Sequence, residues 1–512
     1  MTTHVERLAA LHERLCFARA FPRSAAELRR ALRGLARFER LARPVKDELE
    51  NTGIAGTLVR YPFNYRMAQW LLARHGRAIS IDWRAYKRHE WDEVAAALSL
   101  VVAWAENEGL DDDDVPSWDW IAWAKRGDRR SDLAWLIAML QRRGLEPEVE
   151  RHIYESLDLP LIWDLAGCRD AVTAARLPVG RVFYTRALLQ GRPADFAGDV
   201  RAPAAALELL RPRRADRIID AARAALSQRE REFHVIVHAN REETYRFDAG
   251  RGLEIYVFGL DRRLRLTLEA DYGALLVKNG VPIGYGLAVL LFDRADIAIN
   301  VFETYRAGES PFIFSRFAAL FHHHFGAEKL VMRRYQVGWQ NPEGIETGSF
   351  WFYYRLGFRP IDQRVRELAA GESARLARRR GARSNPEMLR RLSRSDMVLC
   401  LDGTPVERFR DVAVRSVGLA VTRLIERRFD GDRRRALETL GARVSRALGA
   451  RVHGRLVPVV ALIPDLARWP AADRRQLAAV VLAKEARREG PYVRALRRAG
   501  AFRQFLVRRL RA

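Results

Sequence analysis

Two apolar runs are joined through an Asn-Gly pair in the segment Ala274-Leu275-Leu276-Val277-Lys278-Asn279-Gly280-Val281-Pro282-Ile283. Asn-Gly accepts the positive φ angles of a type I′ turn, so the segment predicts a β-hairpin. The second run continues through residues 284–292, where Gly284 and Gly286 indicate a bulge or a close approach to the backbone. A turn at 293–296 leads to a third strand, 297–303, which completes an antiparallel meander.

The next segment predicts a helix and a strand that returns to the same sheet. Residues 312–325 have the apolar spacing of a helix, with Ser310 as the expected N-cap and Pro311 in the first turn. A short strand, 329–332, follows. A strand, a helix and a strand in so short a span predict a right-handed crossover to a parallel neighbour.

A second helix is expected to begin at Asn341 and to run through five aromatic residues to its end at Gly357, before a last strand at 358–361. It ends in Tyr353-Tyr354-Arg355-Leu356-Gly357-Phe358, and Tyr353, Gly357 and Phe358 fit a Tyr-x-x-x-Gly-Phe pattern. With the preceding order of elements, this ending resembles the GNAT superfamily of N-acyltransferases. The resemblance covers about residues 250–362.

The resemblance implies a fold in which two parallel central strands part and an acyl-CoA lies in the gap. The donor, acetyl-CoA or another acyl-CoA, would have its pyrophosphate at the turn before the first helix, where backbone N–H groups attract anions. This assigns Arg306, Gly308 and Ser310 to the donor, together with Phe302. The same turn contains Glu309, whose carboxylate would have to point away from the pyrophosphate or pair with Arg306.

Transfer of an acyl group to an amine needs a base for the ammonium proton and an acid for the departing thiolate. The resemblance implies Glu303 as the base and Tyr353 as the acid. Both residues also have a purely structural interpretation. Tyr353 lies in the aromatic run 350–354 and could belong to the core, and Glu303 could pair with Arg306.

The length of 512 residues suggests about three domains. Residues 1–228 have mainly helical spacing, with a capping-box sequence at Ser24 to Glu27. Residues 229–365 form the expected GNAT-like α/β domain, which begins with an apparent β-branched strand at 233–238. Residues 366–512 return to helical spacing. The predicted fold class is therefore multidomain α+β, with a central mixed sheet and flanking helices between an all-α N-terminal region and a basic helical C-terminal region.

The chain has a formal charge of +25, and most of the excess lies after residue 365. Residues 366–512 contain 35 Lys and Arg against 15 Asp and Glu. Such a surface suits nucleic acid or an anionic membrane, although an Arg-rich, Ala-rich composition also describes a chain from a GC-rich genome. Two alternatives to acyl-CoA chemistry therefore remain open. One is an inactive GNAT-like binding protein with a basic C-terminal region, and the other is an aminoacyl-tRNA-dependent transferase.

The remaining signals concern compartment and metals. Cys16, Cys168 and Cys400 are far apart and form no metal-type or disulfide-type pattern, which fits a reducing compartment. With no secretory start and no apolar stretch of spanning length, we expect a cytoplasmic protein. His322-His323-His324 would project in different directions from a helix, so no metal is expected there. The amine acceptor is expected to be a small molecule or a peptide.

Overall fold

The computed structural model describes residues 3–86, 91–110, 115–142, 144–191, 195–378 and 381–509. The chain divides into two compact units. The first comprises residues 1–186, 217–238 and 279–282, and the second comprises residues 187–216, 239–278 and 283–512. No helix in the described ranges is long and apolar enough to cross a membrane.

The first unit is mainly helical and also contains a small sheet of three antiparallel strands in the order β1-β3-β2. The expected all-α N-terminal region is therefore wrong in this respect, because the three strands are only three or four residues long and too short to show a strand period. The predicted N-cap is present, since Ser24 Oγ accepts a hydrogen bond from Glu27 N at 3.2 Å. The elements are α1 (His4–Ala20), α2 (Ala25–Ala36), α3 (Phe38–Ala42), β1 (Leu58–Tyr61), α4 (Tyr65–His75), β2 (Ile79–Ile81), α5 (Trp91–Ser99), α6 (Asn107–Leu110), α7 (Ser117–Ala124), α8 (Asp132–Arg142), α9 (Pro147–Ser156), β3 (Leu161–Asp164) and α12 (His234–Val237). Helix α11 (Pro212–Ser227) spans a boundary between the units.

The strand predicted at 233–238 is wrong. These residues form the short helix α12, and Val235, Ile236 and Val237 are all buried. A short apolar run does not distinguish a buried strand from a buried helical turn, and here burial on all sides overrides β propensity. As a result, the rings of His234 and His238 lie in contact, with centroids 4.9 Å apart and planes inclined by 56°, instead of at opposite ends of a strand.

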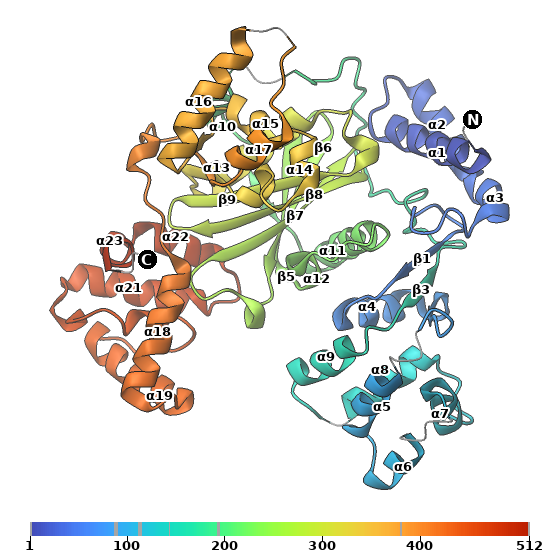
Figure 1. Cartoon of the computed structure of the whole chain (residues 1–512), viewed down its shortest axis with the longest axis horizontal. Coiled ribbons are helices and arrows are strands. Elements are labelled where there is room, and N and C mark those ends of the chain that lie inside the picture. Colours follow the sequence, from blue (N-terminus) through green and yellow to red (C-terminus); the bar gives the residue numbers. More distant parts are fainter. Residues whose placement is uncertain are drawn as a thin grey trace. The chain divides into compact units, whose positions relative to one another are not determined.

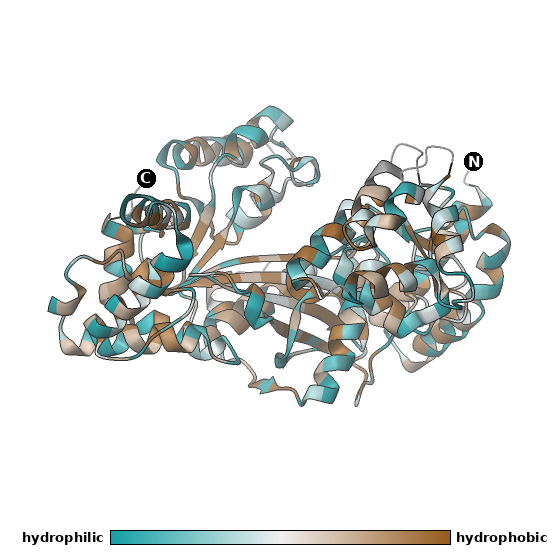
Figure 2. Ribbon diagram, turned by 90° about the horizontal axis from the view of Figure 1, so that it is seen from below, coloured by the Kyte–Doolittle hydropathy of each residue, from teal (hydrophilic) through white to brown (hydrophobic). Residues whose placement is uncertain are grey.

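The second unit contains a nine-stranded mixed sheet in the order β11-β12-β10-β9-β8-β7-β6-β5-β4. Strands β5 to β9 run side by side in Figure 1. In Figure 2 the strands of the sheet are coloured largely as hydrophobic residues. The strands are β4 (Leu207–Leu209), β5 (Ala239–Gly250), β6 (Leu253–Leu260), β7 (Ala270–Lys278), β8 (Val281–Leu291), β9 (Arg294–Val301), β10 (Lys329–Met332), β11 (Arg359–Pro360) and β12 (Met397–Cys400). The coarse fold prediction is therefore confirmed: the protein is mixed α+β, with a large central sheet and flanking helices.

The predicted meander is confirmed as β7, β8 and β9, with Asn279 and Gly280 both at positive φ in the first turn. The strand glycines mark close approaches. A Cβ on Gly284 would lie 2.4 Å from the Asn300 carbonyl oxygen of β9. A Cβ on Gly286 would lie 2.7 Å from the ring of Phe317, so a helix packs directly on this part of β8.

That helix is α13 (Ser310–Phe325), and it connects β9 to β10 as predicted. Strands β9 and β10 are parallel, with Lys329 opposite Arg294 and Val331 opposite Asp296. Ser310 is not the N-cap, because the helix begins one residue earlier than predicted and Ser310 is its first residue. Glu309 takes the capping position, and its side chain makes no capping bond.

The second predicted helix is divided into α14 (Pro342–Glu346) and α15 (Ser349–Arg355). Asn341 caps α14 as expected, with Oδ1 accepting from Gly344 N at 3.2 Å. Gly348, at φ +66°, breaks the helix. Strand β12 lies in the region predicted to be helical and separates β10 from β11, antiparallel to both. Its four apolar residues were too few to show a strand period.

Further helices complete the second unit: α10 (Phe196–Arg201), α16 (Gln363–Arg378), α17 (Pro386–Leu392), α18 (Val414–Phe429), α19 (Arg433–Leu448), α20 (Val457–Val460), α21 (Ala471–Lys484), α22 (Gly490–Arg498) and α23 (Gly500–Arg509). The consecutive histidines near the end of α13 contact backbone carbonyl groups. His323 Nε2 lies 2.8 Å from the Ala202 carbonyl oxygen, and His324 Nε2 lies 2.8 Å from that of Ala205.

Buried charges join α21 and α22 to the sheet. The Glu243 carboxylate on β5 accepts hydrogen bonds from Glu489 N at 2.6 Å and Gly490 N at 2.7 Å, at the start of α22. Lys484 pairs with Glu489 and donates to the Glu269 carbonyl oxygen at 2.8 Å. Both side chains of this pair are fully buried. The C-terminal helices are therefore part of the core of this unit.

Asp271 on β7 lies beside this cluster and makes stability depend on pH. Burial, with the charges of Glu489 and Glu269, raises its pKa from 3.8 to about 7. The folded state thus retains a proton that the unfolded state loses, so stability is expected to fall as pH rises from about 4 to about 7. Asp271→Asn should remove this slope and increase the free energy of unfolding at pH 8 by roughly 2 kcal/mol, since the partial exposure of Asp271 lets solvent screen its charge. Urea unfolding from pH 4 to 8 measures the dependence of the unfolding free energy on pH, and the exposed Asp248→Asn serves as control. Equal slopes in the unmodified chain, Asp271→Asn and Asp248→Asn would contradict the role of Asp271.

Candidate active site

A pocket of about 260 Å³ opens in the second unit where β9 and β10 stop pairing. The last residue of β9 that pairs with β10 is Asp296, and the pocket begins at Ile299 on the same strand, which is still paired with β8 there. Its wall comprises Ile299, Asn300, Val301, Arg306, Ser310, Gln336, Asn341, Glu343, Gly344, Thr347, Ser349, Phe352 and Tyr353. Three of the six residues predicted from the sequence, Arg306, Ser310 and Tyr353, are among them.

Arg306 and Ser310 line the pocket at the start of α13. The Arg306 guanidinium pairs with Glu343 at 2.8 Å, and both side chains are about half exposed. Its Nε also donates to the Val301 carbonyl oxygen at 3.3 Å. An exposed ion pair of this kind contributes little energy, so an anion can compete with Glu343 for Arg306. Ser310 is the first residue of a 16-residue helix, whose N-terminus favours negative charge.

Tyr353 reaches the pocket from α15. Its ring is packed edge-on against Phe314 of α13, with centroids 5.6 Å apart. Burial raises the pKa of its hydroxyl above the usual value, so the phenol is protonated at physiological pH. The hydroxyl has no hydrogen-bond partner among the described residues. Tyr353 is therefore both a core aromatic residue and a proton donor available to a molecule in the pocket.

Glu309 is turned away from the pocket. Its carboxylate is buried and accepts from Lys278 Nζ at 2.7 Å and from Arg251 Nε at 3.1 Å. Burial opposes its ionisation, but these hydrogen bonds outweigh that effect and hold its pKa below the usual value. The predicted conflict with a bound anion is thus avoided by pairing with Lys278 and Arg251, not with Arg306.

The other three predicted residues do not line the pocket. Glu303 is exposed at the start of a 3-10 turn, residues 303–305, and makes no ion pair with Arg306. Phe302 is buried, and its ring lies 6.2 Å from that of Tyr285. Gly308 is buried, and its N–H already donates to the Tyr305 carbonyl oxygen at 2.9 Å. It cannot serve a phosphate without breaking that bond.

Several polar residues of the pocket were not predicted: Gln336, Asn341, Thr347 and Ser349. Thr347 and Ser349 flank Gly348, and their hydroxyl oxygens lie 2.9 Å apart. The sequence did contain a signal for this break in the helix, because Gly348 lies between two residues with hydroxyl side chains. The break exposes both hydroxyl groups to the pocket.

A charged cluster fixes the backbone just before Gln336. Arg333 pairs with Asp296 of β9 at 2.6 Å and with Asp396 at 2.8 Å, next to β12. Burial raises the pKa of Asp296 to about 6, against the opposing charges of Arg294 and Arg333. The cluster joins β9 to the residues that follow β10 and precede β12.

No group of three or more His, Cys, Asp or Glu side chains within the described residues could hold a metal ion. Comparisons of the chain with known protein families, with curated proteins and with solved structures find no match in any of the three.

Proposed function

We propose that this protein is a cytoplasmic acyl-CoA-dependent N-acyltransferase that transfers an acyl group to an amine of a small molecule or peptide. The observation that carries the proposal is the pocket at the parting of β9 and β10, lined by Arg306, Ser310 and Tyr353. This is where a resemblance to GNAT enzymes would place the donor.

The pocket combines the groups that such a reaction needs. Arg306 and the start of α13 attract a phosphate. A volume of about 260 Å³ is small for a whole CoA, so we assign the thioester arm to the pocket and the nucleotide to its rim. The amine nitrogen attacks the thioester carbonyl, the carbon–sulfur bond breaks, and Tyr353 gives its proton to the leaving thiolate. The proton lost by the amine goes to Glu303 through water.

The proposal is tested by release of free CoA thiol from acetyl-CoA and longer acyl-CoAs in the presence of an amine panel containing polyamines, amino acids and peptides. We expect release that requires both an acyl-CoA and one class of amine, with the acylated amine detected by mass spectrometry. No turnover with any donor, from protein shown to be folded, would contradict it.

Arg306 and Glu343 give a paired prediction for donor affinity. Arg306→Gln removes the cation and should weaken binding of CoA about tenfold or more, as expected for a hydrogen bond to a charged group. Glu343→Gln removes the competing carboxylate and should strengthen binding. Calorimetry on both variants measures this, and changes in the same direction in both would contradict the assigned role of the pair.

A second candidate function, binding of nucleic acid, is favoured by the exposed arginines of α18 and α19. Eight of them have no carboxylate partner among the described residues: Arg415, Arg423, Arg427, Arg428, Arg434, Arg435, Arg443 and Arg446. Paired arginines would already be neutralised, whereas these remain free to contact phosphates. Helices α18 and α19 therefore expose much positive charge to solvent.

For this candidate, filter binding with bulk tRNA should show affinity that falls steeply with salt. Neutralisation of three or more phosphates gives a slope of about −3 or steeper in log K against log salt. Replacing Arg427, Arg428, Arg434 and Arg435 by Gln should make the slope shallower. Retention that is weak and insensitive to salt would contradict nucleic-acid binding, and retention of anionic vesicles alone would indicate a membrane instead.

A further inference from the structure

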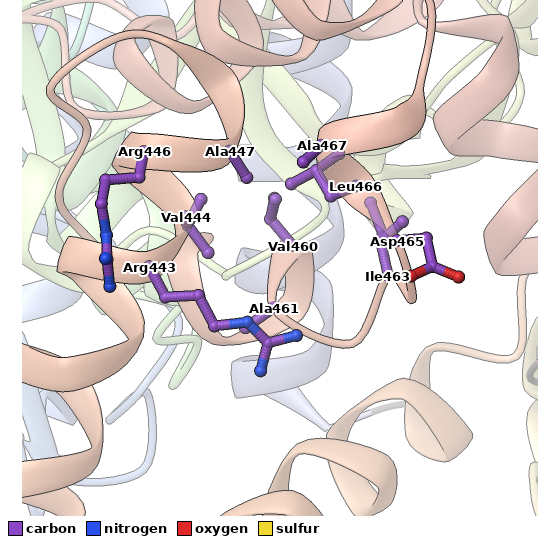
Figure 3. A pocket seen from close by; sticks show the side chains of 10 residues that line it. All are labelled: Arg443, Val444, Arg446, Ala447, Val460, Ala461, Ile463, Asp465, Leu466 and Ala467. Carbon is purple, nitrogen blue, oxygen red and sulfur yellow. The ribbon is translucent and has the colours of Figure 1, made fainter.

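A second pocket lies within the C-terminal helices, between α19, α20 and the 3-10 turn that follows (Figure 3). Its volume is about 380 Å³, within the range of small-molecule sites. It is lined by Arg443, Val444, Arg446, Ala447, Val460, Ala461, Ile463, Asp465, Leu466 and Ala467. It shares no residue with the candidate active-site pocket at the end of β9.

The floor of this pocket is aliphatic. Val444, Val460, Ile463 and Leu466 are buried, and Figure 3 shows Val444 and Val460 between the two sides of the pocket. Three alanines, Ala447, Ala461 and Ala467, leave the space that larger side chains would fill. Burial of an aliphatic chain here gains the usual hydrophobic free energy.

The rim carries positive charge without a protein partner. Arg443 and Arg446 lie one turn apart on α19, both are exposed, and neither pairs with a carboxylate in the part of the chain that the structure describes. Arg474 of α21, which does not itself line the pocket, donates to the Ala447 carbonyl oxygen at 3.1 Å. Its Nε–H is buried without an acceptor among the described residues.

The one acidic residue of the lining does not neutralise these arginines. In Figure 3 the Asp465 carboxylate lies on the side opposite Arg443 and Arg446 and points away from the valines. It is 4.0 Å from Arg468 and well exposed. The two sides of the pocket therefore differ in charge, and the unpaired arginines are on one of them.

We infer that this pocket binds an aliphatic monocarboxylate, with its chain on the valine floor and its carboxylate at Arg443 and Arg446. A guanidinium matches a carboxylate in geometry as well as in charge. An uncharged chain would leave the arginines unused, and a cation would be repelled by them. This site is separate from the proposed acyltransferase pocket and does not depend on it.

Calorimetry of the full chain with octanoate, octanol and octylammonium tests the inference. We expect saturable binding of one octanoate, octanol weaker by about tenfold or more, and no binding of octylammonium. Arg443→Gln with Arg446→Gln should weaken octanoate about a hundredfold. Ala447→Phe should abolish binding by filling the space. Arg434→Gln with Arg435→Gln, on the same helix and with the same loss of charge, should leave it unchanged, as should Tyr353→Phe.

Circular dichroism establishes that each variant is folded. Equal affinity for octanoate and octanol, or full octanoate binding by the Arg443/Arg446 double variant, would overturn the inference. So would the absence of octanoate binding by the unmodified chain, including a result in which anionic vesicles bind and octanoate does not. A loss caused by Tyr353→Phe would place octanoate in the other pocket and also overturn it.

Discussion

Replacement of Tyr353 by Phe is expected to lower kcat for acyl transfer by about 10² to 10⁴, the usual contribution of a positioned general acid. The thiolate would then leave without a proton from the enzyme. Because the Tyr353 hydroxyl has no hydrogen-bond partner among the described residues, its removal should leave the free energy of unfolding nearly unchanged. KM for the donor should change little, since the aromatic ring that packs against Phe314 is retained.

The neighbouring Tyr354 provides the control. It is partly buried, stacks on Phe350 and lies under the Arg359 guanidinium at 4.2 Å, but it does not line the pocket. Tyr354→Phe should retain turnover. Full turnover by the Tyr353 variant would remove Tyr353 as the acid and leave it as a core residue. Equal losses in both variants would point to damage to α15 instead of loss of a proton donor.

Lys484→Met is expected to lower the free energy of unfolding by about 3 to 5 kcal/mol, because it leaves the Glu489 carboxylate buried without its ion-pair partner. Both side chains are fully buried, and among the described residues Glu489 would retain only Arg265 as a nearby cation, at 3.8 Å. The substitution also removes the ammonium that lies 4.1 Å from the centre of the Tyr492 ring. Guanidinium unfolding followed by circular dichroism measures the loss.

Two further variants separate charge from packing in this cluster. The double variant Lys484→Met with Glu489→Gln should recover part of the loss, because no uncompensated charge remains. Arg487→Gln, at an exposed pair with Glu242, should change stability by less than about 1 kcal/mol. A loss below about 1 kcal/mol for Lys484→Met would contradict the view that this cluster anchors the C-terminal helices to the sheet.

Local sequence signals predicted much of the central fold. The Asn-Gly turn at 279–280, the strands on each side of it and the crossover through α13 to β10 are all present. These features depend on turn chemistry and apolar period within a few residues, which a sequence displays directly. The errors concern segments whose structure depends on distant partners. Residues 233–238 became a helix, and β12 pairs with strands that are far from it in sequence.

The candidate site was predictable only in part. Arg306, Ser310 and Tyr353 converge because the crossover and the last helix return to one end of the sheet. The orientation of Glu309 was not predictable, because its partners Lys278 and Arg251 lie on another part of the sheet, at and near the strand ends. The exposed position of Glu303 and the internal hydrogen bond of Gly308 likewise depend on the shape of the turn between β9 and α13.

The central claim is that the pocket at the parting of β9 and β10 holds an acyl-CoA, and calorimetry with acetyl-CoA and longer acyl-CoAs tests it most directly. We predict saturable binding of one donor per chain, lost when Thr347→Trp fills the pocket and kept in Thr422→Trp, a matched change on the surface of α18. No saturable binding of any acyl-CoA by the unmodified chain, or equal binding by both tryptophan variants, would contradict it.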